Sequence, residues 1–204
     1  MEVEKTGIKL ILPNTNNNGV LLNLKQGERL YFLAGPIKGG GDWQTKAIEL
    51  LQQKDPFCYI ACPRSYDIHH ELFKYQMQPT EALCFENQTM WERYYMERAS
   101  WFGSIIFWLP CEDKQNPRKN GPYARDTYGE IARCSVKSSK PEIFSFNKGY
   151  NRRFNVIIGA EKDFPGLNGI KKNSNADHAE IFDFYSNLED TITAAVKKGK
   201  EWNP

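Results

Sequence analysis

The sequence lacks the features of several large classes of protein. Its 204 residues contain no apolar run that approaches the length of a membrane span, and no apolar segment of the signal-peptide kind follows Met1. Lysines and arginines are scattered and the net charge is only +2, so no basic block indicates a phosphate-backbone partner. We therefore expect a cytoplasmic protein that binds neither a membrane nor a nucleic acid polymer.

Patterns of metal ligands and disulfides are also missing. The three histidines lack the spacing of metal ligands, and the five cysteines form an odd set without a Cys-x-x-Cys pair. The sequence therefore predicts reduced thiols and no metal site.

The chain is long enough for one well-buried α/β core and short for two domains. We divide it into an N-terminal extension, residues 1–28, and one α/β domain, residues 29–204. The extension holds two short apolar runs, Ile8–Leu12 and Val20–Leu24, with an asparagine-rich turn between them. This pattern predicts a peripheral β-hairpin.

In the domain, short apolar runs alternate with longer amphipathic segments, which is typical of a doubly wound, mostly parallel sheet. The runs predict five strands, at residues 29–34, 57–62, 104–109, 141–146 and 154–158. The longer segments predict helices at residues 43–53, about 81–102 and 126–136, and one or two within 179–200.

Two loops follow strands at the edge of the sheet where such folds bind ligands. The first strand ends in Gly35-Pro36-Ile37 and a glycine run, Gly39–Gly41, and the second is followed by Arg64. The glycines match neither the Rossmann fingerprint nor a Walker A loop. Together with Arg64 and Arg125 they could nevertheless hold a 5′-phosphate.

The segment Thr127-x-x-Glu130 opens a helix after the third central strand and permits two interpretations. As a capping box, the Thr127 hydroxyl and the Glu130 carboxylate satisfy backbone N–H groups. As a ligand site, Glu130 lies near the positive end of the helix dipole, which lowers its pKa and keeps it ionised.

Four motifs occur in a fixed order along residues 29–150: Tyr31-Phe-Leu-Ala-Gly-Pro-Ile37 followed by Trp43, Trp91-Glu92, Phe107-Trp-Leu-Pro110, and Tyr123-Ala-x-x-Thr127-x-x-Glu130. This ordered set resembles the nucleoside 2-deoxyribosyltransferase-like family. The resemblance implies a flavodoxin-like three-layer αβα fold around a five-stranded, mostly parallel sheet. It also implies a homo-oligomer that exchanges or removes the nucleobase of a deoxyribose.

When the functional residues of the family are carried over position by position, the resemblance implies that Glu130 is the nucleophile and that Glu92 is an acidic residue of the active-site wall. It places Tyr31, Gly35 and Pro36 in the pocket floor.

The sequence departs from the family pattern in two places. The chain has Ser100-Trp-Phe-Gly103 where the family tends to enter the strand directly through Ala-Asp. The family also has an Asp after the third strand that handles the base, and here Glu112 and Asp113 both compete for that role. The resemblance further places Arg152, Arg153 and the segment after Gly159 near the pocket of a neighbouring subunit.

The chemistry of these residues can be stated without the family. Cleavage of a C–N glycosidic bond passes through a cationic sugar that an ionised carboxylate stabilises and can trap, while an acid protonates the leaving base. Glu130 suits the first role and Glu92 the second. Trp43 or Tyr123 could stack on a base, whereas core packing is the better interpretation of Phe107. No metal or redox cofactor is required.

Three functions fit these observations. The first is a 2-deoxyribosyltransferase that passes the sugar from a nucleoside to a free nucleobase through a covalent Glu130 intermediate. The second is a hydrolase in which water resolves that intermediate, acting on nucleosides or their 5′-monophosphates. The third is a nucleotide-binding module without turnover.

Overall fold

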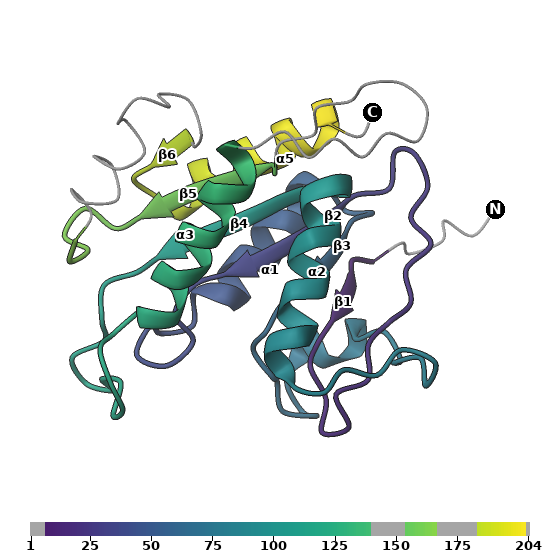
Figure 1. Ribbon diagram of the computed structural model, residues 1–204, viewed down its shortest axis with the longest axis horizontal. Coiled ribbons are helices and arrows are strands. Elements are labelled where there is room, and N and C mark those ends of the chain that lie inside the picture. The colour runs from purple at the N-terminus through teal and green to yellow at the C-terminus, as the bar shows by residue number, and fades with distance from the viewer. Residues whose placement is uncertain (1–6, 140–153, 167–182, 203–204) are drawn as a thin grey trace.

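The computed structural model describes residues 7–139, 154–166 and 183–202, which form an α/β fold around one six-stranded sheet (Figure 1). Every pairing between these strands is parallel, and their order is β1-β3-β2-β4-β5-β6. The strands are β1 (Lys9–Ile11), β2 (Leu30–Ala34), β3 (Tyr59–Ala61), β4 (Gly103–Leu109), β5 (Val156–Ala160) and β6 (Asp183–Tyr185). The prediction of a mostly parallel α/β sheet is therefore confirmed, whereas the predicted number of five strands is wrong, because β1 and β6 add to the sheet.

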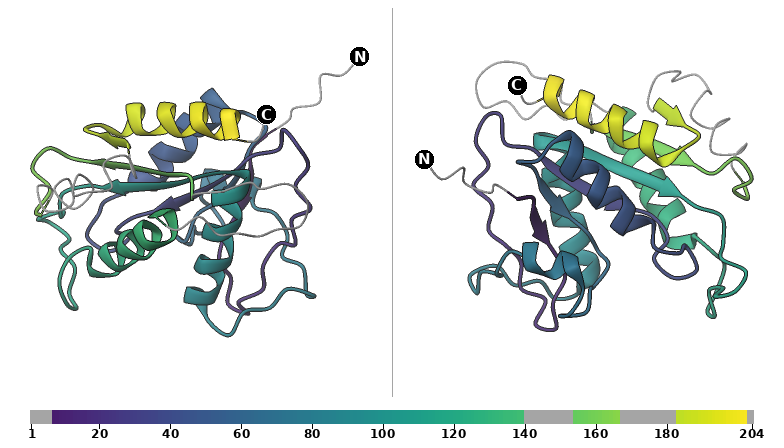
Figure 2. Two further views of the ribbon diagram at one scale, coloured as in Figure 1. Left: turned by 45° about the horizontal axis from the view of Figure 1, so that its top comes forward. Right: turned by 180° about the vertical axis from the view of Figure 1, so that it is seen from behind.

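Helices cover both faces of the sheet, as Figure 2 shows most clearly in its left view. The helices α1 (Trp43–Lys54) and α5 (Leu188–Trp202) contribute to one buried apolar cluster. On the opposite face, α2 (Gln88–Phe102) and α3 (Arg125–Ser139) contribute to a second. A short 3₁₀ helix, η1 (Glu71–Tyr75), follows β3.

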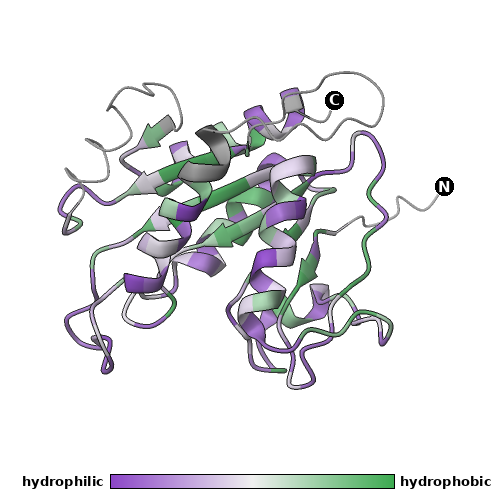
Figure 3. Ribbon diagram, viewed as in Figure 1, coloured by the Kyte–Doolittle hydropathy of each residue, from purple (hydrophilic) through white to green (hydrophobic). Residues whose placement is uncertain are grey.

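The central strands are buried along their whole length and mostly apolar because both of their faces are covered (Figure 3). Their side chains alternate between the two clusters. In β2, Phe32 and Ala34 face α2 and α3, whereas Tyr31 and Leu33 face α1 and α5. This alternation decides which residues of β2 can reach a site on either side.

The predicted N-terminal hairpin is wrong. The first apolar run supplies β1, which extends the main sheet by pairing in parallel with β3. The second run forms no strand, and its backbone at Val20 is bound by Tyr95 of α2. The Tyr95 hydroxyl accepts a hydrogen bond from the Val20 N–H at 2.6 Å and donates one to the Val20 carbonyl at 2.9 Å.

Two helices begin at other positions than the sequence predicted. Helix α2 starts at Gln88 rather than near residue 81, because Asn87 caps it and accepts a hydrogen bond from the Met90 N–H at 3.0 Å. Residues 183–185, within the segment predicted to be helical, form β6, and α5 begins after Asn187. The strand predicted at 141–146 lies outside the described residues, as do Arg152 and Arg153.

No helix in the described part of the chain is both long enough and apolar enough to cross a membrane.

Candidate functional site

A cavity of about 360 Å³ lies where β2 ends, beneath the first turns of α2 and α3. Strand β2 stands between β3, which follows it in the chain, and β4, so the order of strands changes direction beside it. Open α/β sheets bind ligands at such a point. The cavity is lined by Phe32, Ala34, Gly35, Pro36, Ile37, Lys38, Pro63, Gln88, Thr89, Glu92, Arg118, Ala124, Asp126, Thr127 and Glu130.

The floor of the cavity depends on Gly35. This residue has φ +154°, and a Cβ added to it would lie 2.3 Å from the Trp108 carbonyl oxygen and 2.8 Å from the Trp43 ring. Only glycine fits so close to a neighbouring backbone. The Trp43 indole then donates a hydrogen bond to the Pro36 carbonyl at 2.9 Å, which fixes the loop over the end of β2.

Two half-buried carboxyl groups, Glu92 of α2 and Glu130 of α3, line the wall of the cavity. Burial raises the pKa of Glu130 to about 8, with further contributions from the negative charges of Glu92 and Asp126 and an opposing one from Arg133. Burial also raises the pKa of Glu92, against a 2.9 Å hydrogen bond that its carboxylate accepts from Gln88. The site thus brings together two interacting carboxyl groups that both hold protons more strongly than usual.

The predicted lowering of the Glu130 pKa by the helix dipole is therefore wrong. Helix α3 begins at Arg125, so Glu130 lies in its second turn, where the dipole effect has faded. The capping-box interpretation fails for the same reason. Thr127 is the third residue of the helix and lies buried against the cavity.

The structure places Gly35, Pro36 and Thr127 in the cavity wall, but Tyr31 and Trp43 face the other side of the sheet. The Tyr31 hydroxyl donates a hydrogen bond to Asp55 at 2.9 Å, within the layer formed by α1 and α5. Phe32 takes the position in the floor that the resemblance gave to Tyr31.

Three other residues that the sequence suggested are absent from the lining of the cavity. Tyr123 packs against Phe164, and its hydroxyl donates a hydrogen bond to the Pro110 carbonyl at 2.8 Å. Asp113 accepts a hydrogen bond from the Gln115 N–H at 2.9 Å, and Glu112 accepts one from the Arg118 N–H at 2.8 Å. Both acidic side chains hold the loop after β4, and neither lines the cavity.

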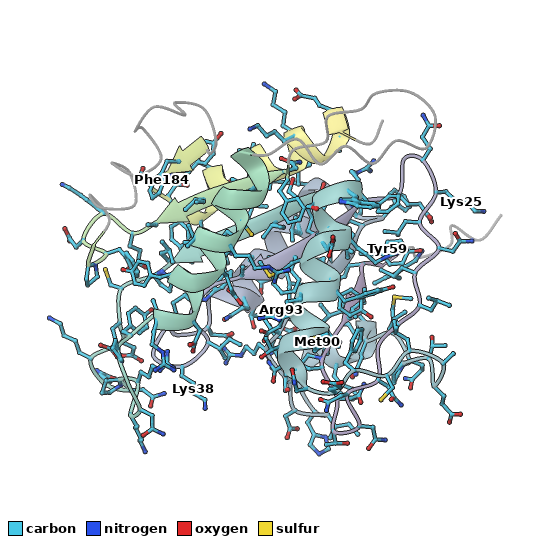
Figure 4. The ribbon with its side chains drawn as sticks, viewed as in Figure 1. Lys25, Lys38, Tyr59, Met90, Arg93 and Phe184 are labelled. Carbon is cyan, nitrogen blue, oxygen red and sulfur yellow. The ribbon has the colours of Figure 1, made fainter. Side chains whose placement is uncertain are left out.

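Arg64 and Arg125 lie on different sides of the carboxyl pair. Arg64 lines a second cavity of about 650 Å³, which shares Ile37, Lys38 and Arg118 with the first. Arg125 is 63% exposed, pairs with Asp126, and lines a third hollow that also contains Glu92 and Glu130. In Figure 4, Lys38, which lines the first two cavities, lies near the start of α3, and Arg93, which lines the third hollow, lies between α2 and α3.

Sequence reasoning missed Gln88 and Arg118. Gln88 lies one helical turn before Glu92, and its amide donates hydrogen bonds to both Glu92 and the Pro63 carbonyl. Arg118 is 17% exposed and contacts Asp126 at 3.0 Å, at the boundary between the first two cavities. The spacing of Gln88 and Glu92, four residues apart on one helix face, could have indicated Gln88. Nothing in the local sequence indicates Arg118.

Within the described residues, no group of three or more His, Cys, Asp or Glu side chains is placed to hold a metal ion. No protein-family model matches the chain, and no curated protein matches it. The cavity and its carboxyl pair are therefore the features that indicate a function.

Proposed function

We propose that this protein is a nucleoside 2-deoxyribosyltransferase that cleaves the N-glycosidic bond of a 2′-deoxynucleoside and transfers the sugar to another nucleobase. Strands β3-β2-β4-β5-β6 follow one another in the flavodoxin-like order 2-1-3-4-5 when they are renumbered along the chain, and this supports the fold that the sequence motifs suggested. Assembly into homo-oligomers and a cytoplasmic location remain predictions from the sequence.

The observation that carries the proposal is the pair formed by Glu92 and Glu130. The charge of Glu92 contributes to the raised pKa of Glu130, so the two groups titrate as a coupled pair. With the Glu130 pKa at about 8, the pair retains a proton at neutral pH. Such a pair contains one carboxylate and one carboxylic acid, which are the two groups that glycosidic cleavage requires.

The shared proton of this coupled pair can occupy either carboxyl group, and the reactive form is the one in which the proton lies on Glu92 while Glu130 is ionised. The bond between C1′ and the base nitrogen breaks, its electron pair stays with the base, and the Glu92 proton neutralises that nitrogen. The Glu130 carboxylate stabilises the cationic sugar and forms an ester bond to C1′.

In the second step a nitrogen of the incoming base attacks C1′, and the ester bond breaks to restore the Glu130 carboxylate. The attacking nitrogen gives its proton to the Glu92 carboxylate, so the pair returns to its initial state. If water attacks instead, the products are free deoxyribose and the same regenerated pair, which is the hydrolase reaction. Because Glu130 lines an open cavity, its position favours catalysis over a binding module without turnover.

A chromatographic assay with 2′-deoxyinosine and adenine tests the proposal. Appearance of 2′-deoxyadenosine supports the transferase, whereas hypoxanthine without exchange supports the hydrolase. Glu130→Gln and Glu130→Ala should each lower the rate by about a thousandfold or more, because neither variant can form the ester. Glu81→Gln, at an exposed glutamate outside the cavity, is the matched control. If deoxynucleosides and their 5′-phosphates all remain intact, or if Glu130→Gln is fully active, the proposal is wrong.

A further inference from the structure

The second cavity lies next to the first and is rich in positive charge. Its wall is formed by the loop after β2 and by residues 116–120 of the loop after β4. Four cationic side chains line it, together with the carboxylate of Asp42. These cations are Lys38, Arg64, Arg118 and Lys119. A cavity with this lining favours an anionic ligand.

The two loops are held together by contacts that involve their backbones. The Gly39 carbonyl of the loop after β2 accepts a hydrogen bond from the Asp113 N–H of the loop after β4 at 2.7 Å, and within the loop after β4 Glu112 binds the Arg118 N–H. Gly39 has φ +79°, and a Cβ at this residue would lie 3.0 Å from the Arg118 nitrogen. The glycine therefore lets the two loops approach closely. Their contacts fix the backbone that carries Lys38, Arg118 and Lys119.

Two of the four cations have carboxylate partners and two are available to a ligand. Arg64 contacts Asp42 at 2.9 Å, and Arg118 contacts Asp126 at 3.0 Å. Lys38 and Lys119 make no ion pair within the described residues, and both are exposed. The arginines are thus oriented by their partners, while the lysines can move toward a bound anion.

The four cations fall into two pairs, which we call two levels because one pair lines the cavity of the carboxyl groups and the other does not. Lys38 and Arg118 line both cavities, at their common boundary, whereas Arg64 and Lys119 line only the second. Glu92 and Glu130 line the first cavity and are absent from the lining of the second. A ligand with its glycosidic carbon at the carboxyl pair would meet the first pair of cations, then the second.

We propose that the second cavity binds a chain of two or more phosphate groups, so that the substrate is a nucleoside di- or triphosphate. This inference builds on the proposed function. One phosphate carries about 1.5 to 2 negative charges. At the boundary of the two cavities it would meet Lys38 and Arg118, and a longer phosphate chain that extends into the second cavity would also meet Arg64 and Lys119. The charge-assisted hydrogen bonds of these groups would then hold the substrate by its phosphates.

Binding can be measured apart from turnover by titrating the full chain calorimetrically with orthophosphate, pyrophosphate and tripolyphosphate at constant ionic strength. We expect pyrophosphate and tripolyphosphate to bind at least about tenfold more tightly than orthophosphate. Lys119→Ala should weaken their binding about threefold to tenfold and leave orthophosphate binding almost unchanged. The control is Lys114→Ala, which removes an exposed lysine of the same loop that does not line the cavity.

The inference is overturned if pyrophosphate binds no better than orthophosphate, or if the Lys119→Ala and Lys114→Ala variants behave alike. Substrate comparison separates this inference from the proposed function. Equal kcat/KM for a deoxynucleoside and its triphosphate would refute the phosphate subsite and leave the glycosidic reaction standing. Tight tripolyphosphate binding without cleavage of any substrate would refute the reaction and leave the subsite standing.

Discussion

Replacing Glu130 with glutamine should change how the stability of the protein depends on pH. Below its ordinary pKa of 4.5, Glu130 is protonated in both the folded and the unfolded chain. As the pH rises toward about 8, the unfolded chain loses this proton while the folded chain keeps it, so the free energy of unfolding falls. Above pH 8 both states are ionised, and the loss is complete. The amide of the Glu130→Gln variant does not titrate, so the variant should lack this part of the pH dependence.

The size of the effect follows from the pKa change. A rise from 4.5 to about 8 is worth about 5 kcal/mol at 1.36 kcal/mol per pH unit. The Glu130 side chain is only half-buried, and solvent screening reduces the expected effect to about 2 kcal/mol. Between pH 5 and pH 8.5, the free energy of unfolding of Glu130→Gln should therefore rise by about 2 kcal/mol relative to the unsubstituted protein.

Urea denaturation followed by tryptophan fluorescence, at both pH values, measures this difference. The chain has five tryptophans, and comparison with circular dichroism tests whether unfolding is two-state. Glu81→Gln, at an exposed position, is the control and should show no such pH-dependent gain. If Glu130→Gln and the unsubstituted protein keep the same stability difference at pH 5 and pH 8.5, burial does not raise the Glu130 pKa and the reasoning is refuted.

Three further predictions concern the cavity. The rate of base release should be bell-shaped in pH and fall above about pH 8, where the carboxyl pair loses its last proton; a rate that keeps rising to pH 9.5 would contradict a shared proton. Gln88→Leu removes the hydrogen bond that lowers the Glu92 pKa, so the pair should lose its first proton at higher pH and the acidic limb of that profile should move up. An unmoved limb would show that Glu92 does not titrate as part of the reacting pair. Gly35→Ala should lower the free energy of unfolding, measured by urea denaturation, by about 3 kcal/mol, because the alanine Cβ would overlap the Trp108 carbonyl. A loss below about 1 kcal/mol would show that the loop after β2 is not held against Trp108.

The core strands could be predicted well because burial on both faces requires continuous apolar runs. The runs at 29–34 and 104–109 correspond to β2 and β4 almost residue for residue. The partner of β1 could not be predicted in this way. A strand of three residues carries too little pattern to distinguish a hairpin from an edge strand, and its pairing with β3 is a tertiary contact.

The carboxyl pair was predictable because the helices that carry Glu92 and Glu130 precede and follow the central strand β4. The protonation of the pair was not. Sequence position indicated the helix dipole, whereas the pKa of Glu130 depends first on burial, which only the assembled cavity determines. The placement of Tyr31 failed for a related reason. All five residues of β2 are apolar or aromatic, so the sequence does not show which alternate residues face the cavity.

The loop after β2 connects the two layers of helices in a way that matters for engineering this fold. Its Pro36 carbonyl is held by Trp43 from the α1 layer, and its Gly39 carbonyl by the backbone of the loop that leads to α3. Substitutions beneath α1, remote from any bound ligand, would therefore shift the cavity floor. Libraries aimed at new substrate specificity should accordingly include the neighbours of Trp43. The shape of the cavity depends on residues on the α1 side of the sheet as well as on the residues that line it.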